Sequence, residues 1–330
     1  MDSLFTEEVL NSLYPYQQDK ITRQIRDYLE SNAKSRNYIH KFCPKCGTKD
    51  PVLTKGGFSN SGKQMLRCHS CNRRFTVDHG QLTFYSHQDE SQWDQLILDS
   101  LEKVPETETA AKINVSPYTA FRMRHKFLHA CEQLVSSTVL AGEIELDEKY
   151  VQVSHKGSKF LDVKPRKRGE PASKRGLSTD QVCLPTGVER LGNAVLLPTN
   201  LGNPSSKDLM SLKPYIQPAS LVWIDGKTSY NKLLEEMNCD VRIVGDHKTY
   251  TSVDHINNVN SFHSMISQTY TFYRGVATKY LNRYCPLFVL MREYSGYDLQ
   301  EKLLEIKNKL RQISDYFYIR QIKTEDLFSY

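Results

Sequence analysis

The 330-residue sequence predicts a multidomain α+β protein: a small cysteine-containing domain and a helical region, then a larger domain whose mixed sheet is flanked by helices. Three observations predict this class: two Cys-x-x-Cys pairs near the N-terminus, two helical segments after them, and short apolar runs alternating with helical segments from residue 140 onward. We expect five regions: a helical lead-in at 1–40, the cysteine domain at 41–80, a helical region at 88–135, the larger domain at 140–295 and a helical tail at 296–330.

The composition is that of a soluble globular protein, with 39% hydrophobic and 25% charged residues. The net charge of +6 favours a polyanionic partner only modestly, since an ordinary, slightly basic protein explains it as well. No run approaches the ~18 apolar residues of a membrane span, and the first residues lack the basic and apolar regions of a signal peptide. We therefore expect a cytoplasmic protein without membrane association, in which cysteines stay reduced.

The cysteine domain contains the motifs CPKC and CHSC, whose thiolates are Cys43, Cys46, Cys68 and Cys71. Two such knuckles supply a tetrahedral thiolate set, the geometry that Zn²⁺ prefers. An iron–thiolate site or a pair of disulfides fits a basic cytosolic protein less well. The sequence thus predicts a zinc ribbon, with hairpin turns at Gly47, Gly56, Gly57 and Gly62. Its basic side chains either contact phosphates or form a solvated face: Lys63, Arg67, Arg73 and Arg74.

The region 88–135 predicts helices joined by a short turn. Ser91–Lys103 has an apolar face, and a turn at Asn114-Val115 precedes Ser116, a good N-cap, and Pro117 at the first helical position. This pattern predicts a helix-turn-helix whose second helix enters the DNA major groove, although similar helical hairpins occur in proteins that bind no DNA. The side chains expected on its outer face are Tyr118, Thr119, Arg122 and Arg124.

The larger domain begins with a strand, Gly142–Gln152, that has Asp147 at its centre. Further strands are expected at Asp180–Glu189, Gly192–Thr199, Ser220–Asp225 and Asp240–Val244, and helices near Ser206–Tyr215, Asn231–Met237 and His255–Ser267. Three consecutive strands followed by alternating helices and strands match an RNase H-like order. Asp147, Asp225 and the polar face of the His255–Ser267 helix can then converge on one two-metal phosphoryl-transfer centre. We expect Glu145 and Glu148 behind the ligands or at the surface, and His255 either orienting the site or packed.

A basic stretch, Lys164–Arg175, is expected to be a loop because of its Pro and Gly content. It is either a flexible, solvated segment or a clamp on the DNA backbone. The basic residues proposed for the clamp are Arg166, Lys167, Arg168, Lys174 and Arg175. The aromatic residues of Tyr270–Tyr294 favour core packing over stacking on unpaired bases.

These motifs resemble the DDE-type (RNase H-like) bacterial insertion-sequence transposases of the branch with an N-terminal zinc ribbon and helix-turn-helix. The motifs that carry the resemblance over about residues 40–295 are CPKC…CHSC, NVSPYTAFRMRH, ELDEKYV, the basic loop with KRGLSTDQV, VWIDGKTSY and HINNVNSFHSMISQTYTFYRGVATKYLNRY. The resemblance implies cleavage and strand transfer of double-stranded DNA, at element ends and target, by two Mg²⁺ ions. Mn²⁺ may substitute for them, and Zn²⁺ is structural. It also implies a nucleoid-associated homodimer in the synaptic complex.

Within that resemblance Asp147 and Asp225 match the first two catalytic carboxylates, and Asn260 stands where the third, a Glu, is usual. A branch of the family has Asn there with a downstream Lys, for which Lys279 is the candidate. The amide oxygen of Asn260 can bind a hard cation, but it brings no negative charge. Three functions therefore stay open: an active transposase, a DNA-binding protein that has lost catalysis, and a structure-selective nuclease such as a junction resolvase.

Overall fold

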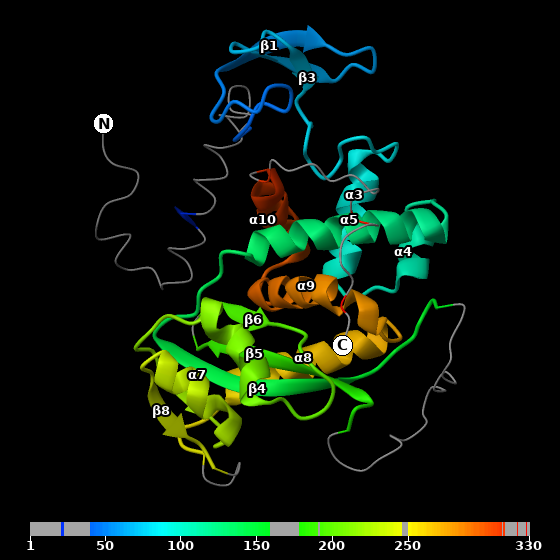
Figure 1. Cartoon of the computed structure of the whole chain (residues 1–330). Coiled ribbons are helices and arrows are strands. Elements are labelled where there is room, and N and C mark those ends of the chain that lie inside the picture. The colour runs from blue at the N-terminus through cyan, green and yellow to red at the C-terminus, as the bar shows by residue number, and fades with distance from the viewer. Residues whose placement is uncertain are drawn as a thin grey trace, which may run out of the picture. The chain divides into compact units, whose positions relative to one another are not determined.

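The computed structural model describes residues 21–22, 40–158, 178–190, 192–245, 250–311, 313, 322 and 328. The chain divides into two compact units, Met1–His79 and Gly80–Tyr330 (Figure 1). The basic loop 164–175 and nearly all of the lead-in 1–40 lie outside the described residues. None of the described helices is long and apolar enough to span a membrane.

The first unit contains a three-stranded antiparallel sheet, β1 (Leu53–Phe58), β2 (Gln64–Cys68) and β3 (Arg74–Thr76), in that order. Leu66 and Phe75 form a small buried core with the knuckle cysteines. Gly62 has φ +75° in the β1–β2 turn, a conformation that favours glycine. The expectation that Gly56 and Gly57 make a turn is wrong: both lie in β1, where a Cβ on Gly56 would come within 3.1 Å of the β2 backbone.

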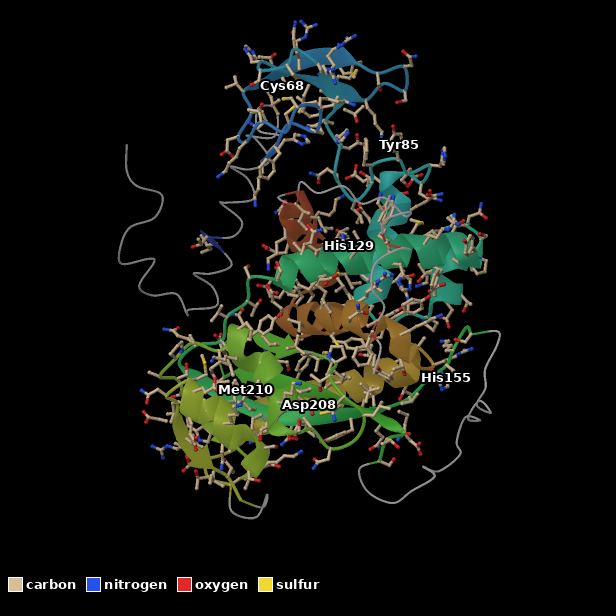
Figure 2. All side chains as sticks on the ribbon, in the orientation of Figure 1. Cys68, Tyr85, His129, His155, Asp208 and Met210 are labelled. Carbon is tan, nitrogen blue, oxygen red and sulfur yellow. The ribbon has the colours of Figure 1, made fainter. Side chains whose placement is uncertain are left out.

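The second unit opens with three helices, α3 (Glu90–Leu101), α4 (Glu106–Lys112) and α5 (Pro117–Val135). A capping box at Asp89 begins α3, and the Ser116 hydroxyl accepts the Thr119 N–H at 3.1 Å to begin α5, as the sequence predicts. The turn between α4 and α5 includes Asn114 in the left-handed region at φ +52°. Figure 2 shows His129 along α5, the long helix of this group.

The sheet of the second unit has the strand order β6-β5-β4-β7-β8. Its strands are β4 (Glu143–Gln152), β5 (Gln181–Glu189), β6 (Ala194–Leu196), β7 (Leu221–Ile224) and β8 (Asp240–Ile243). β4, β5 and β6 pair antiparallel, whereas β7 and β8 continue the sheet in parallel with β4. The result is a mixed sheet, as predicted, and β4 lies at its centre.

Helices cover both faces of this sheet (Figure 1). On one face, Ile144 and Leu146 of β4 pack in a core with the short helices between β6 and β8. These are α6 (Ser206–Leu209), the 3-10 helices Met210–Tyr215 and Thr228–Tyr230, and α7 (Asn231–Glu236). The opposite face, which carries Glu145, Asp147 and Val151, contacts α8 (Asn257–Phe272). β4 is therefore buried on both faces, whereas the sequence predicted one buried face.

The helical region and the sheet share one core in the second unit. Phe127 of α5, Val182 of β5 and Phe288 of α9 (Leu281–Glu293) belong to the same buried cluster, which α10 (Leu299–Arg311) also joins. Most of the aromatic residues between α8 and the end of α9 are buried in it, which confirms packing as their main role: Tyr273, Tyr284, Phe288 and Tyr294. The regions 88–135 and 140–295, which we expected as separate domains, thus lie in one compact unit.

Candidate metal centres and DNA-contacting residues

The four knuckle sulfurs of the first unit lie within 4.8 Å of one another (Cys68 is labelled in Figure 2). The Sγ atoms of Cys43 and Cys71 are 3.8 Å apart, and those of Cys46 and Cys68 are 4.0 Å apart. Sulfurs bound tetrahedrally at ~2.3 Å from Zn²⁺ lie about 3.8 Å from one another, whereas a disulfide would join them at about 2.05 Å. The thiolate set therefore fits a zinc ion and contains no disulfide.

In the second unit, the two predicted aspartates lie level on neighbouring parallel strands. β4 pairs with β7 through Ile144 and Val222, then Glu145 and Trp223, and this register places Asp147 beside Asp225, which directly follows β7. Adjacent strands are about 4.8 Å apart, so both carboxylates reach one site. Trp223 packs in the core on the α8 side of the sheet, and by alternation Asp225 faces the same side as Asp147.

Asp147 is poorly solvated, and its carboxylate is costly to ionise without a cation. The pKa of Asp147 is raised to about 7, chiefly by burial and also by the nearby carboxylates of Glu148 and Asp225. The Glu148 N–H, which donates to Asp147 Oδ1 at 2.8 Å, and the Lys227 ammonium act in the opposite direction. A bound divalent ion would remove this cost, because it favours the charged carboxylate.

Asn260 lies in the first turn of α8, opposite β4. Its side chain is half-buried and is hydrogen-bonded to the hydroxyl of Tyr250, whose pKa is raised by burial and by Asp147, Glu145 and Asp225. Tyr250 thus belongs to the same site, although the sequence analysis did not single it out: it lies outside the motifs and has no regular spacing to them.

Glu145 holds the start of α8 against β4. It is fully buried, and its carboxylate accepts the backbone N–H groups of Asn258 at 2.8 Å and Val259 at 3.0 Å, together with the Asn258 side-chain amide at 2.8 Å. The α8 N-cap residue, Ile256, makes no side-chain cap, so Glu145 supplies from the sheet the acceptor that a helix N-terminus needs.

Arg190 completes this clamp. Its Nε donates to Glu145 at 3.1 Å, its guanidinium stacks 3.6 Å from the centre of the Trp223 ring, and one amino group donates to the His255 carbonyl at 2.8 Å. His255 precedes α8 rather than lying on it, and its Nδ1 is 3.4 Å from Glu145. The sequence analysis placed Glu145 near the site but missed Arg190, which follows β5 without any motif of its own.

His263, one turn after Asn260, is buried against Asp147. Its Nδ1 lies 3.5 Å from Asp147 Oδ2, and its Nε2 lies 2.9 Å from the Thr186 hydroxyl of β5. Burial, with a smaller effect from Lys149, lowers the pKa of His263 to about 3. The sequence analysis gave this histidine no role.

The lysines that lie beside the carboxylates of β4 are Lys227 and Lys149, not the predicted Lys279. Lys227 donates to Glu148 at 2.9 Å and to the Tyr150 hydroxyl at 3.1 Å, and Lys149, on the face of Asp147, donates to Ser267 of α8 at 2.6 Å. The Lys227 ammonium lowers the pKa of Asp147. Burial lowers the pKa of Lys149, and the Asp147 carboxylate opposes that shift.

Lys279 lies at the opposite end of β4. Its ammonium is 5.0 Å from the centre of the Tyr280 ring, and the preceding residue, Thr278, accepts the Ser154 N–H at 2.8 Å. Ser154 is seven residues beyond Asp147 in an extended run, which at about 3.3 Å per residue is roughly 20 Å away. The structure therefore does not bring Lys279 to the aspartates, because the whole length of α8 separates it from Asn260.

The predicted DNA-contacting residues of α5 differ in exposure. Tyr118 is 58% exposed, Arg122 stacks on its ring and donates to its hydroxyl, and Thr119 is half-buried. Arg124 is only 2% exposed and donates to the Val104 carbonyl at 3.1 Å. The expectation that Arg124 faces outward is wrong, because α5 is covered on that side and the guanidinium connects it to the turn before α4.

In the first unit, Arg67, Arg73 and Arg74 are exposed around β2 and β3, so they are available to a phosphate backbone. Arg74 also donates to the Gly56 carbonyl at 3.2 Å, and Lys63 pairs with Asp78. The basic side chains of 164–175 lie outside the described residues.

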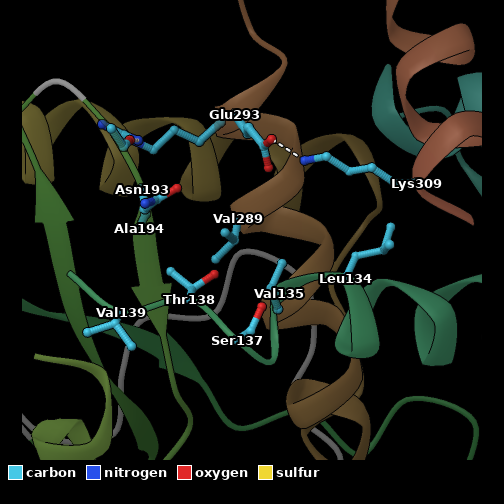
Figure 3. Close-up of a pocket in the computed structure, with 12 residues that line it drawn as sticks. Leu134, Val135, Ser137, Thr138, Val139, Asn193, Ala194, Val289, Glu293 and Lys309 are labelled. Atoms are coloured by element: carbon cyan, nitrogen blue, oxygen red, sulfur yellow. Dashed lines mark hydrogen bonds and ion pairs between the residues drawn. The ribbon is translucent and has the colours of Figure 1, made fainter. Parts of the chain in front are cut away.

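One cavity of the second unit is lined by neither of the two aspartates. It has a volume of about 370 Å³ and lies between the end of α5, β6 and α9, where the ion pair of Lys309 and Glu293 closes one side (Figure 3). A site for duplex DNA needs an open surface rather than such a cavity, so we assign the candidate active site by its side chains.

The mixed sheet flanked by helices, with two level aspartates facing one helix, resembles a transposase catalytic domain. Residues 139–292 match the family model of the ISXO2-like transposase domain, which confirms the resemblance for this segment. The match includes Asp147, Asp225 and Asn260.

Among solved structures, the chain is 14% identical to a pre-cleavage Mos1 transpososome and to the Mos1 strand transfer complex, with TM-scores of 0.24 and 0.28. Each alignment covers 70% of this chain and 80% of that chain. The Mos1 mariner paired end complex with Mn is 13% identical with a TM-score of 0.27, covering 72% of this chain and 80% of that chain. These TM-scores are too low to support an argument. No curated protein matches the sequence.

Proposed function

We propose that the chain is the transposase of a bacterial insertion sequence, which binds the terminal inverted repeats of its element and cleaves and joins DNA strands. The observation that carries the proposal is the level pair of Asp147 and Asp225 facing Asn260 within an ISXO2-like transposase domain. We further propose that the sheet is RNase H-like, since its order β6-β5-β4-β7-β8 has three antiparallel strands followed by two parallel ones.

Asp147, Asp225 and Asn260 would hold two divalent ions, Mg²⁺ or Mn²⁺, which when bound activate the attacking water or 3′-hydroxyl and stabilise the leaving oxygen. The raised pKa of Asp147, about 7, supports a cation beside it. Glu145 and Arg190 fix the first turn of α8 against β4. This would hold Asn260 in one position relative to Asp147. Lys227 and Lys149 supply positive charge beside the aspartates for the phosphates of the scissile strand.

DNA binding is proposed for two surfaces. The first is the zinc ribbon, with Zn²⁺ on Cys43, Cys46, Cys68 and Cys71 and phosphate contacts from Arg67, Arg73 and Arg74. The second is the N-terminal end of α5, where Tyr118, Thr119 and Arg122 would enter the major groove as in a helix-turn-helix. The basic residues of 164–175 would add backbone contacts. Synapsis of two ends would require a homodimer, acting on the nucleoid.

The test is strand cleavage and joining by the full chain on DNA that carries the ends flanking its gene, with Mg²⁺ and with Mn²⁺. We expect 3′-end cleavage and strand transfer that are lost in Asp147→Asn and Asp225→Asn, while end binding persists. Specific end binding without cleavage in either metal would support the second candidate, a DNA-binding protein without catalysis, which the neutral Asn260 favours. Cleavage of branched DNA without strand joining would instead indicate a nuclease.

A further inference from the structure

The proposed function gives no role to His263, a buried side chain at the candidate site. The residue is 7% exposed, and its ring has Nε2 2.9 Å from Thr186 Oγ1 on β5 and Nδ1 3.5 Å from Asp147 Oδ2 on β4. A packed histidine needs neither contact to Asp147 nor this orientation.

The hydrogen bonds of Thr186 favour one tautomer of the ring. The Leu184 carbonyl, 3.0 Å from the Thr186 hydroxyl, can only accept, and when the hydroxyl donates its hydrogen there, Thr186 Oγ1 accepts from the N–H at Nε2 of His263. In the neutral ring Nδ1 then has no hydrogen, and its lone pair points toward the Asp147 carboxylate.

When Asp147 is ionised, two acceptors face each other at 3.5 Å and repel unless a proton or a cation lies between them. An imidazolium–carboxylate pair would be expected at about 2.7–2.9 Å. Two ligand atoms in adjacent positions of one octahedral ion, each ~2.1 Å from the ion, lie about 3 Å apart. A decrease of the Nδ1–Oδ2 distance from 3.5 Å to about 3 Å would therefore let both atoms bind one cation.

We propose that His263, through Nδ1, is a protein ligand of the catalytic metal centre, together with Asp147, Asp225 and Asn260. The inference rests on the proposed function, since it adds a ligand to that same site. Asn260 and His263 are three residues apart on α8 and share the side that faces β4. Among the described residues, only the four knuckle cysteines form a group of three or more His, Cys, Asp or Glu ligand atoms within 4.8 Å of one another. The Asp147 carboxylate and the His263 imidazole would then serve as ligands of the same ion.

An imidazole ligand changes which ion the site prefers. Oxygen ligands suit Mg²⁺ and Mn²⁺ alike, whereas an imidazole nitrogen favours first-row transition ions. The site would accordingly bind Mn²⁺ or Co²⁺ in preference to Mg²⁺. Thr186 serves as a positioning residue, because its hydroxyl holds the tautomer that leaves Nδ1 free to bind.

The test is Mn²⁺ binding to the zinc-loaded full chain, without DNA, followed by electron paramagnetic resonance. Pulsed measurement of the bound Mn²⁺ should show modulation from a directly coordinated ¹⁴N, which carboxylate and amide-oxygen ligands do not give. In His263→Gln this ¹⁴N modulation should disappear, and Mn²⁺ affinity should fall by roughly tenfold to a hundredfold. His263→Asp should keep the affinity, lose the modulation and shift the preference toward Mg²⁺.

The matched control is His125→Gln. His125 is also buried in the second unit, at 3% exposure, but its ring contacts Arg283 and Tyr280 rather than a carboxylate. This variant should keep both the ¹⁴N modulation and the Mn²⁺ affinity. Should His263→Gln fail to fold, the ¹⁴N modulation in the unaltered protein, compared with Asp147→Asn, still decides.

Two negative results have different meanings. Mn²⁺ that binds through Asp147, as judged by its loss in Asp147→Asn, but shows no coordinated ¹⁴N would overturn the His263 ligand and leave the proposed function intact. Mn²⁺ binding that is insensitive to Asp147→Asn would overturn the metal centre itself.

Discussion

Replacing Glu145 by Gln should destabilise the start of α8 more than any other single change of charge on β4. The carboxylate is fully buried, is paired with Arg190 at 3.1 Å, and accepts two backbone N–H groups of α8. A glutamine side chain keeps the shape of Glu145 but removes its charge. Its amide NH₂ group would also face N–H donors where the carboxylate now accepts their hydrogen bonds. Breaking a buried pair costs about 3–5 kcal/mol because the partner charge stays uncompensated, and we expect the lower end of that range for an isostere.

Glu143 supplies a matched control on the same strand. It also faces Arg190, at 3.8 Å, but its side chain is 59% exposed, against 0% for Glu145. Exposed pairs contribute about 0–1 kcal/mol, so Glu143→Gln should change the free energy of unfolding by less than about 1 kcal/mol.

The assay is hydrogen exchange followed by mass spectrometry, supported by urea unfolding, since urea does not screen charges as guanidinium does. Exchange at the amides of Asn258 and Val259 should accelerate in Glu145→Gln, while the C-terminal half of α8 changes less. Metal affinity should also fall in Glu145→Gln, because Asn260 lies in the same turn of α8. Equal effects of the two substitutions, or unchanged exchange at the start of α8, would refute the clamp.

Four further predictions concern the two candidate metal centres and the lysine beside the aspartates. Because the pKa of Asp147 is raised from 3.8 to about 7, chiefly by burial, the metal-free folded state holds a proton there below pH 7, and metal binding must release it. Mn²⁺ affinity should therefore fall about tenfold per pH unit below 7 and level off above it. Because the pKa of Asp147 is higher in the folded state than in the unfolded state, the free energy of unfolding of the metal-free protein should fall as pH rises from about 4 to 7. Urea unfolding at several pH values would detect this. Cys43→Ser or a strong chelator should remove one zinc per chain, measured by atomic absorption, and unfold the ribbon while the thermal transition of the second unit persists. Lys227→Ala should slow DNA cleavage by roughly tenfold or more, since it removes the cation beside Glu148 and Asp147, whereas Lys279→Ala should have a smaller effect; the reverse order would restore Lys279 as the catalytic lysine.

The order of the strands along the chain could be predicted because each strand has its own local signal. Alternating or continuous apolar runs indicate where β4, β5 and β7 lie, and a carboxylate within such a run or at its end is visible in the sequence. Asp147 and Asp225 were found in this way, and the register of β4 with β7 places them level. The cluster of four cysteines was equally accessible, since the spacing of the two Cys-x-x-Cys pairs predicts it.

Exposure on helices was harder to predict, because it depends on what packs against a helix. Arg124 was expected outside by helical periodicity, yet α5 is enclosed by α3, α4 and α9, and the guanidinium is buried with hydrogen bonds. Lys279 was assigned by a family pattern, and only the length of α8 shows that it lies at the far end of β4.

The side chains that no motif revealed are those that act between elements. Arg190, Thr186 and Tyr250 come from three loops or strands, and each has meaning only through a partner distant in sequence: Glu145, His263 and Asn260. A one-dimensional pattern contains no such pairing, so the sequence can name the metal-binding carboxylates but not what orients the third ligand. This has a consequence for Asn260 itself. A neutral amide in place of a carboxylate was the main argument against catalysis, yet a site with a buried histidine beside Asp147 does not depend on Asn260 alone to complete its ligands. The residue that weakens the family pattern and the histidine one turn after it should therefore be judged together, as one ligand pair on α8.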